Sequence, residues 1–250
     1  MKFSFLSGNM LKIIAALAMF IDHMGILLFP ALPIFRIVGR LSFPIFAFMI
    51  SEGTRYTKNK LRYFLSVFII SVICQTVYIF TGGFEPFNIL ITFSLSIILI
   101  YLLNDFKKAL FADERTPCLV IVKALILVTA LALVYLVTEL VRIDYGFAGC
   151  LAPVFASIFD LKDINIPEKF KKLDCLPIRI SCLFIPVFFV MLRNISAGDR
   201  LVSPFLFAAL PILLLYSGKR GTVNMKYFFY LFYPLHLALL EGVHLLLLSL

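Results

Sequence analysis

The chain has 250 residues, of which 62% are hydrophobic, only 15% are charged and 28 are Phe. A soluble domain is usually about half apolar and about a quarter charged, so this composition excludes a soluble enzyme and predicts a polytopic membrane protein. The net charge of +9 fits basic cytoplasmic loops that set topology, and a basic face could also attract an anionic ligand. Without a separate basic domain, we do not expect the protein to bind nucleic acid.

Nine apolar segments are candidate membrane spans, since a transmembrane helix needs about 20 mainly apolar residues. The fourth, sixth and eighth segments are short. We interpret the first segment as an uncleaved span, because no small-residue cleavage site follows it. The sequence therefore predicts an all-α fold, with one transmembrane helical domain over residues 1–250. Its spans are 10–29, 33–51, 61–80, 87–103, 118–137, 145–161, 178–195, 201–216 and 227–248.

The loops between these segments differ strongly in basic charge. Fifteen of the 23 Lys and Arg residues lie on one side, namely Lys2 and those of the loops 52–62, 104–117, 162–177 and 217–226. Five lie on the other side: Arg36, Arg40, Arg142, Arg193 and Arg200. Because loops rich in Lys and Arg stay on the cytoplasmic side of a membrane, we expect a cytoplasmic N-terminus and an external C-terminus.

The first span carries three ionisable residues, Lys12, Asp22 and His23, in the stretch KIIAALAMFIDH. Ionisable groups in hydrocarbon cost free energy and therefore often mark functional sites. Eleven residues separate Lys12 from His23, which places them near one helix face and about 16 Å apart along the axis. Lys12 would lie near the cytoplasmic mouth and His23 deep in the outer half. Alternatively, Lys12 only extends its amine to the membrane edge.

The second span places Arg40 at the depth of His23. A very short turn joins the two spans, and His23 and Arg40 lie about 9 Å and about 10 Å below their outer ends. Arg36 precedes Arg40 by four residues and shares its helix face, nearer the surface. Either Asp22 neutralises Arg40 while His23 faces a cavity, or Asp22 and His23 exchange these roles. We interpret Asp22, His23 and Arg40 as the catalytic centre.

Polar residues in later segments could serve two substrates. His236 follows Pro234 by two residues, and a proline inside a span favours a helix that lines a cavity, although a histidine that only packs between helices is an equal alternative. On the acceptor side we expect Arg36, Gln75, Asn88, Asp144, Tyr145 and His236. At the cytoplasmic mouth, Lys12, Arg55, Lys58 and Arg62 could bind the phosphates of a donor, besides setting topology.

This arrangement is chemically compatible with acyl transfer across the membrane. A histidine with a near-neutral pKa can take a proton from an amine or hydroxyl nucleophile. A phosphate-bearing acyl donor would bind the basic residues inside and extend a thin arm toward that histidine. The acceptor would reach the histidine from outside.

Several stretches resemble the TraX family of membrane proteins. They are LKIIAALAMFIDHMG, RIVGRLSFPIFAFMISEG, RYFLSVFIISVICQTVYIF, FNILITFSLSIILIYLL and YLFYPLHLALL, together with a short DYG. The family is named for the conjugative pilin acetyltransferase, a small polytopic protein that acetylates a pilin N-terminal amine. Lys12 and His23 also resemble the Lys/Arg-x10-His pattern of membrane acyltransferase-3 proteins, which modify surface glycans.

The resemblance implies acetyl-CoA as the donor substrate and a protein or glycan as the acceptor, at the inner or plasma membrane. It implies His23 as the catalytic base, with Asp22 and Arg40 orienting it or stabilising the reacting carbonyl. Two other functions stay open. Asp22, His23 and Arg40 could form the ion relay of a proton-coupled secondary transporter, or the chain could be a non-catalytic assembly factor. The histidines lie too far apart in sequence to predict a metal site.

Overall fold

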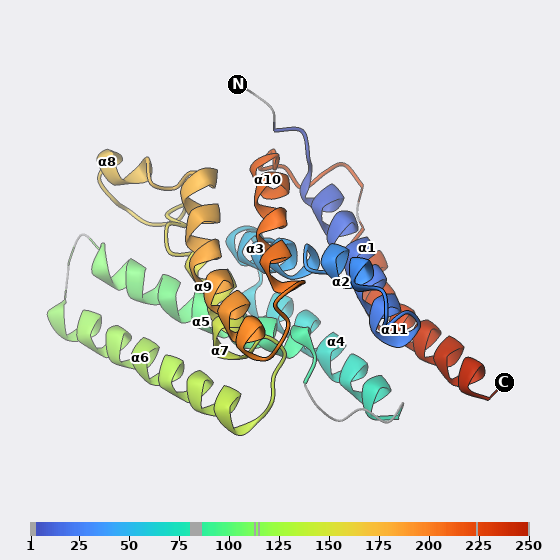
Figure 1. Cartoon of the computed structure of the whole chain (residues 1–250). Helices are drawn as coiled ribbons and strands as arrows, with labels where there is room; N and C mark the ends of the chain where they lie inside the picture. Colours follow the sequence, from blue (N-terminus) through green and yellow to red (C-terminus); the bar gives the residue numbers. More distant parts are fainter. Residues whose placement is uncertain (1–3, 81–86, 113, 115, 224, 250) are drawn as a thin grey trace.

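A computed structural model describes residues 4–80, 87–112, 114, 116–223 and 225–249, which form a bundle of α-helices (Figure 1). Lys2 and Arg115, two of the basic residues used to predict topology, lie outside this part of the chain. The helices are α1 (Gly8–Leu27), α2 (Pro33–Gly39), α3 (Ser42–Tyr56), α4 (Lys60–Phe80), α5 (Ile89–Leu110), α6 (Pro117–Leu140), α7 (Gly146–Ala156), α8 (Glu168–Lys171), α9 (Leu176–Ser196), the 3₁₀ helix η1 (Ser203–Ala208), α10 (Ala209–Leu214) and α11 (Lys226–Leu248).

Local sequence accounts for several helix boundaries. The Ser7 hydroxyl accepts a hydrogen bond from the Met10 amide at the start of α1, and the Asn88 side chain does the same for Leu90 at the start of α5. Such side chains satisfy amides that have no partner inside the helix. Proline occupies the first turn of α2, α6 and α9, where its missing amide costs no hydrogen bond.

The all-α transmembrane fold is confirmed, but the count of nine spans is not. Within the described part of the chain, seven helical segments are long and apolar enough to cross a membrane. The predicted spans 145–161 and 201–216 contain only the short helices α7 and η1–α10, because turn residues at 157–159, 201–202 and 215 end the helical part of these apolar segments early. Hydropathy detects apolar residues and is insensitive to such turns. The span predicted at 33–51 is divided into α2 and α3 at Arg40 and Leu41.

Contacts nevertheless gather the helix ends at two opposite poles. At the pole that we call the inner end, the Gly8 amide donates to the Lys219 carbonyl over 2.8 Å. At the outer end, the Phe87 amide donates to the Arg142 carbonyl over 2.8 Å, which joins the start of α5 to the segment between α6 and α7. Which pole faces the cytoplasm stays a prediction from loop charge.

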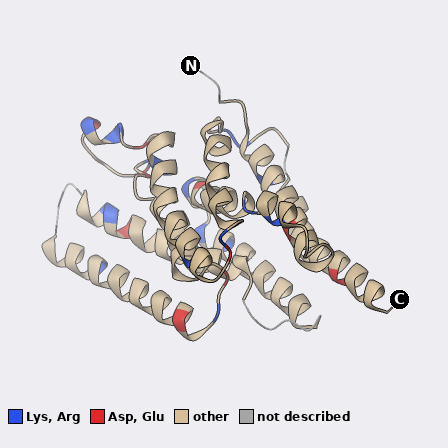
Figure 2. Cartoon of the chain, in the orientation of Figure 1, with Lys and Arg blue, Asp and Glu red and all other residues tan. Residues whose placement is uncertain are grey.

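Helix α7 lies inside the bundle, against α3, α5, α6 and α9. In contrast, α6 lies at the edge of the bundle, and only 6% of its most apolar 18-residue window is buried (Figure 1). The long helices carry few charged residues, whereas α8 and other short connecting segments are rich in them (Figure 2). This distribution leaves wide apolar surfaces exposed, as expected for helices in contact with lipid.

Candidate active site

Two histidines meet where α1 packs against α11. His23 Nδ1 lies 3.1 Å from His236 Nε2, and His236 Nδ1 lies 2.9 Å from the carbonyl oxygen of Phe232. The Phe232 ring stacks on His236 with a centroid distance of 5.1 Å, and Tyr233 meets its edge. Hydrogen bonds and aromatic contacts therefore hold the His236 ring in place.

The partners of these two rings determine where their hydrogens lie. A carbonyl oxygen can only accept, so the neutral His236 ring carries its hydrogen on Nδ1 and leaves Nε2 as an acceptor. His23 must then donate from Nδ1, which leaves its own Nε2 with a free lone pair. The assignment follows from the hydrogen-bond partners. His23 is thus arranged as a base through Nε2.

A cavity of about 620 Å³ leads from the inner end toward this pair, between α1, α3, α4, α5 and α11. Lys12, Arg62 and Arg220 line it on the inner side, and Met19, Phe232 and Tyr233 line its deep part. Met19 precedes His23 by one helical turn, and the other two contact His236. The cavity therefore joins basic residues at one end to the neighbours of the histidines at the other.

The middle of the cavity is apolar and aromatic, with side chains that include Phe46, Tyr63, Phe93 and Phe229. The Lys12 amine lies 5.9 Å from the centroid of the Phe229 ring. This geometry permits a cation–π interaction. A narrow apolar molecule with a charged head would fit both the middle and the inner end.

Asp22 and Arg40 belong to a polar cluster at the outer end, but they are not each other's ion-pair partner. Arg36 Nη1 donates to Asp22 Oδ2 over 2.9 Å, and Arg40 Nη2 donates to Asp199 Oδ2 over 2.5 Å. One of the two predicted alternatives was that Asp22 neutralises Arg40 directly. In the structure Asp199 pairs with Arg40, and Asp22 pairs with Arg36. A side chain on Gly39 would collide with Asp22, so this glycine permits the close approach of α1 and α2.

Two buried atoms of this outer cluster, Asp22 Oδ1 and Arg40 Nε, have no hydrogen-bond partner among the residues that the structure describes. Buried polar atoms without a partner are uncommon and call for an explanation. The sequence pattern did not predict Asp199 as the ion-pair partner of Arg40. As the single acidic residue in the stretch RNISAGDR, near the predicted outer arginines, it offered a signal of charge pairing.

The predicted acceptor residues Asp144 and Tyr145 join the same cluster. Tyr145 has a left-handed backbone with φ of 61°, hydrogen-bonds Arg40 and stacks on Phe43 at a centroid distance of 4.0 Å. Burial raises the pKa of Asp144 to about 6, and the negative charge of Asp22 adds to this, whereas Arg40 opposes it. Besides burial, the pKa of Asp144 therefore depends on the charges of Asp22 on α1 and of Arg40 at the break between α2 and α3.

Gln75 and Asn88, also predicted on the acceptor side, connect α4 to α5. The Asn88 side-chain amide donates to Gln75 Oε1 over 3.0 Å and to the Ser71 carbonyl over 2.8 Å. Neither residue lines the cavity. Their contacts support helix packing.

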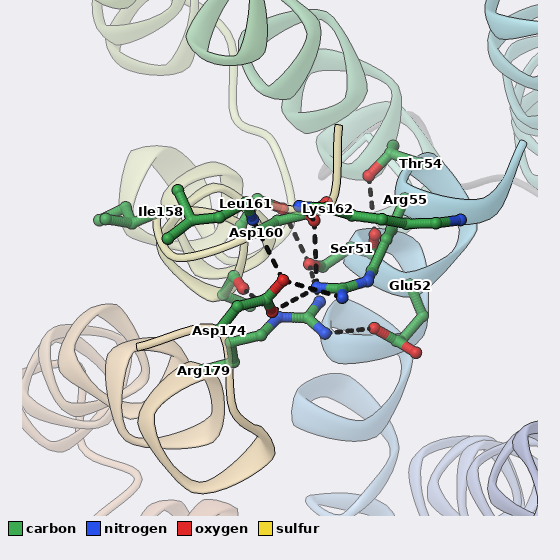
Figure 3. A network of polar contacts seen from close by, with 12 residues as sticks. Ser51, Glu52, Thr54, Arg55, Ile158, Asp160, Leu161, Lys162, Asp174 and Arg179 are labelled. Carbon is green, nitrogen blue, oxygen red and sulfur yellow. Dashed lines mark hydrogen bonds and ion pairs between the residues drawn. The ribbon is translucent and has the colours of Figure 1, made fainter. Parts of the chain in front are cut away.

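The four residues predicted at the inner mouth have different surroundings. Lys12 and Arg62 line the cavity, whereas Arg55 and Lys58 are not among its lining residues. Arg55 donates to both carboxylate oxygens of Asp174, over 2.5 and 2.9 Å, and pairs with Asp160 over 3.0 Å (Figure 3). Arg55 therefore anchors the segment after α7. Arg220, which the charge pattern assigned only to topology, joins Lys12 at the cavity.

A second inner network, also missed in the sequence, surrounds Arg179 (Figure 3). Its Nη1 donates to Glu52 Oε1 over 2.6 Å, and its Nε donates to the Ala156 carbonyl over 3.1 Å. Tyr216 donates to the other Glu52 oxygen over 2.9 Å. Because Glu52 and Tyr216 also line the cavity, this network supports one wall of it.

Comparisons with known proteins cover nearly the whole chain. A family model described as TraX protein matches residues 7–244. The chain is 26% identical over 256 residues to a protein of Dichelobacter nodosus named "Probable fimbrial assembly protein FimC, serogroup H1", and the match covers 94% of each chain. It is 37% identical over 105 residues to an uncharacterized protein of Rickettsia prowazekii (strain Madrid E), which covers 41% of this chain and 40% of the other. No solved structure matches.

Proposed function

Because the chain belongs to the TraX family, we propose that it is a transmembrane acetyltransferase of the cell membrane. It would move an acetyl group from cytoplasmic acetyl-CoA to an amine or hydroxyl acceptor at the outer face. The observation that supports this proposal best is the cavity from Lys12 and Arg220 to the neighbours of the His23–His236 pair. Such a passage lets a donor stay charged at one end while its thioester reaches a base in the membrane.

The donor would bind by its two chemically different parts. The phosphates of CoA would pair with Lys12, Arg62 and Arg220, because ion pairs and charge-assisted hydrogen bonds to phosphate are strong. The thin pantetheine arm would lie among the apolar and aromatic side chains of the middle. The acetyl group would then approach His23 from the inner side.

The transfer itself needs one base and one leaving group. The acceptor nitrogen, as a free amine, forms a bond to the acetyl carbonyl carbon, and the carbon–sulfur bond breaks with its electron pair going to sulfur. His23 Nε2 takes the proton lost by the nitrogen and returns it to the thiolate. The products are an acetamide and CoA thiol, or an acetate ester when the acceptor is a hydroxyl. Arg40 would stabilise the negative charge on the carbonyl oxygen, and Asp22 would hold Arg36 beside His23.

The name of the D. nodosus relative, a probable fimbrial assembly protein, favours a fimbrial subunit as the acceptor. A surface glycan is the alternative within the same reaction class.

Acetyl-CoA labelled in the acetyl group provides the direct test. The purified protein should bind it saturably, release CoA and transfer label to a candidate acceptor. His23→Ala should retain binding but lower transfer by about 10²–10⁴-fold, the usual contribution of a general base. His244→Ala is the matched control, since His244 lies two turns beyond His236 on α11.

Two results would contradict the proposal in different ways. Unchanged transfer by His23→Ala would exclude this histidine as the base. Absence of saturable acetyl-CoA binding by the wild-type protein would exclude the donor and favour proton-coupled transport through Asp22, His23 and Arg40.

A further inference from the structure

A second hollow, separate from the histidine cavity, lies at the outer end between α6, α7 and α9. It has a volume of about 500 Å³. Leu151 and Phe155 of α7 line it, together with Pro186 and Phe189 of α9. We call this hollow the outer groove. It opens on a peripheral part of the bundle, where α6 packs against α5 and α7 and leaves most of its apolar surface exposed.

Among the described residues, the charged side chains that line the outer groove lie at one end of it. Glu139 lies in the last turn of α6, Arg142 follows the end of that helix by two residues, and Arg193 lies in the last turn of α9. The Arg193 guanidinium rests against Gly146 at the start of α7, where any larger side chain would displace it. The remaining lining runs about 12 Å along α7, from Phe147 to Phe155. The groove therefore combines an apolar trough with two cations and one anion at its outer mouth.

This composition matches a zwitterionic lipid. A phosphate diester pairs well with two guanidinium groups, a carboxylate pairs with a primary ammonium, and an acyl chain suits the apolar trough. We propose that the outer groove binds one phosphatidylethanolamine molecule, with its phosphate at Arg142 and Arg193 and its ammonium at Glu139. Phosphatidylglycerol offers the same phosphate and chains but no cation for Glu139, so the carboxylate sets the preference.

The absence of Trp in the chain permits a direct test in vesicles. Phe155→Trp adds a single fluorophore to the inner part of the groove. Leu133→Trp adds one at a similar depth on the exposed face of α6, where Leu133 is 57% exposed, and serves as the matched control. Each protein is reconstituted in phosphatidylglycerol vesicles that contain a small fraction of phosphatidylethanolamine with brominated acyl chains, which quench Trp fluorescence on contact.

The expected result is an enrichment of phosphatidylethanolamine at the groove of about fivefold over the control position, as one extra ion pair would give. Adding Glu139→Gln to Phe155→Trp should abolish this enrichment, because the carboxylate sets the preference. Adding Arg142→Ala with Arg193→Ala should lower the quenching of Phe155→Trp by either brominated lipid, because both lipids lose their phosphate contacts. In the reverse experiment, brominated phosphatidylglycerol in phosphatidylethanolamine vesicles should quench Phe155→Trp less than Leu133→Trp.

Equal quenching at the two positions would overturn the proposal, as would enrichment of phosphatidylglycerol or enrichment of phosphatidylethanolamine that survives Glu139→Gln. Quenching of Phe155→Trp that is unchanged by Arg142→Ala with Arg193→Ala would also overturn it. Lack of quenching at Phe155→Trp alone would show that another protein segment or helix fills the groove, which also contradicts a lipid. Quenching of Leu133→Trp by the brominated lipid verifies insertion in every vesicle set. The measurement needs no acetyl-CoA, so its outcome is independent of the proposed reaction.

Discussion

His23 and His236 are 213 residues apart in the chain, yet their Nδ1 and Nε2 atoms lie 3.1 Å apart between α1 and α11. The pair joins the first and last helices at the deep part of the cavity. Since the Phe232 carbonyl sets the hydrogen position on His236, the orientation of α11 sets the tautomer of His23. His236, predicted to contact the acceptor, therefore orients the ring of His23, the base of the proposed reaction.

His236 should affect the rate and pH dependence of transfer rather than donor binding. His236→Ala removes the acceptor for His23 Nδ1, so kcat should fall by about tenfold with an unchanged KM for acetyl-CoA, and the pH profile should shift. His236→Asn retains an oxygen that can accept the hydrogen bond and should recover part of the rate. Equal losses in the two variants, without a change in the pH profile, would show that His236 only fills space.

The sequence predicted the outer cluster better than it predicted the histidine pair. A short turn fixes α1 and α2 as neighbours, so counting helical rise was sufficient to predict Asp22, His23 and Arg40 at a common level, whereas the pairing of Asp22 with Arg36 was not predicted. Nothing in a linear pattern states that α11 packs beside α1, so His236 was recognised as unusual through Pro234 while its partner was not. Hydropathy likewise recorded residues 145–161 as one apolar segment and could not detect that the helix ends at Ala156. Lateral packing and buried partners such as Asp199 depend on the whole fold.

Membrane orientation is open to a direct measurement. A reporter fused to the C-terminus should be active on the external side, and one inserted after Ser217 should be active in the cytoplasm, because the loop 217–226 is basic. The opposite pattern would place Lys12 and Arg220 outside and remove acetyl-CoA from their reach. Equal signals from both fusions would indicate an even number of passes between these positions.

Lys12 and Arg220 should contribute to donor affinity. Each of Lys12→Ala and Arg220→Ala should raise the KM for acetyl-CoA by about tenfold with little change in kcat, because a phosphate contact far from the thioester acts equally in the ground state and the transition state. Lys58→Ala is the control, since Lys58 is exposed and does not line the cavity. A larger effect of Lys58→Ala than of the other two would place the phosphates elsewhere.

Arg179 should be important for stability. Arg179→Met leaves the Glu52 carboxylate, which is only 3% exposed, without its cationic partner, and should lower the free energy of unfolding by about 3–5 kcal/mol. Combining it with Glu52→Gln should restore part of that loss, since the buried charge is gone. Thermal unfolding in detergent measures both effects, with exposed Arg200→Ala as the control. A double variant less stable than Arg179→Met would show that the ion pair is not the cause.

Asp144 should make stability fall as pH rises through the weakly acidic range. Its folded-state pKa of about 6 lies above the ordinary value of 3.8, so the folded protein holds a proton that the unfolded chain has released between these two values. Folding therefore takes up a proton there, and the free energy of unfolding decreases with rising pH until about pH 6.

Asp144→Asn stays neutral, so its stability relative to wild type should increase from pH 4 to pH 6 and stay constant above. Substituting exposed Asp163 with Asn controls for the loss of one negative charge. If the stability difference between Asp144→Asn and wild type does not vary over this range, the pKa of Asp144 is the same in the folded and unfolded protein. Asp144 would then be exposed to solvent instead of buried in the outer cluster.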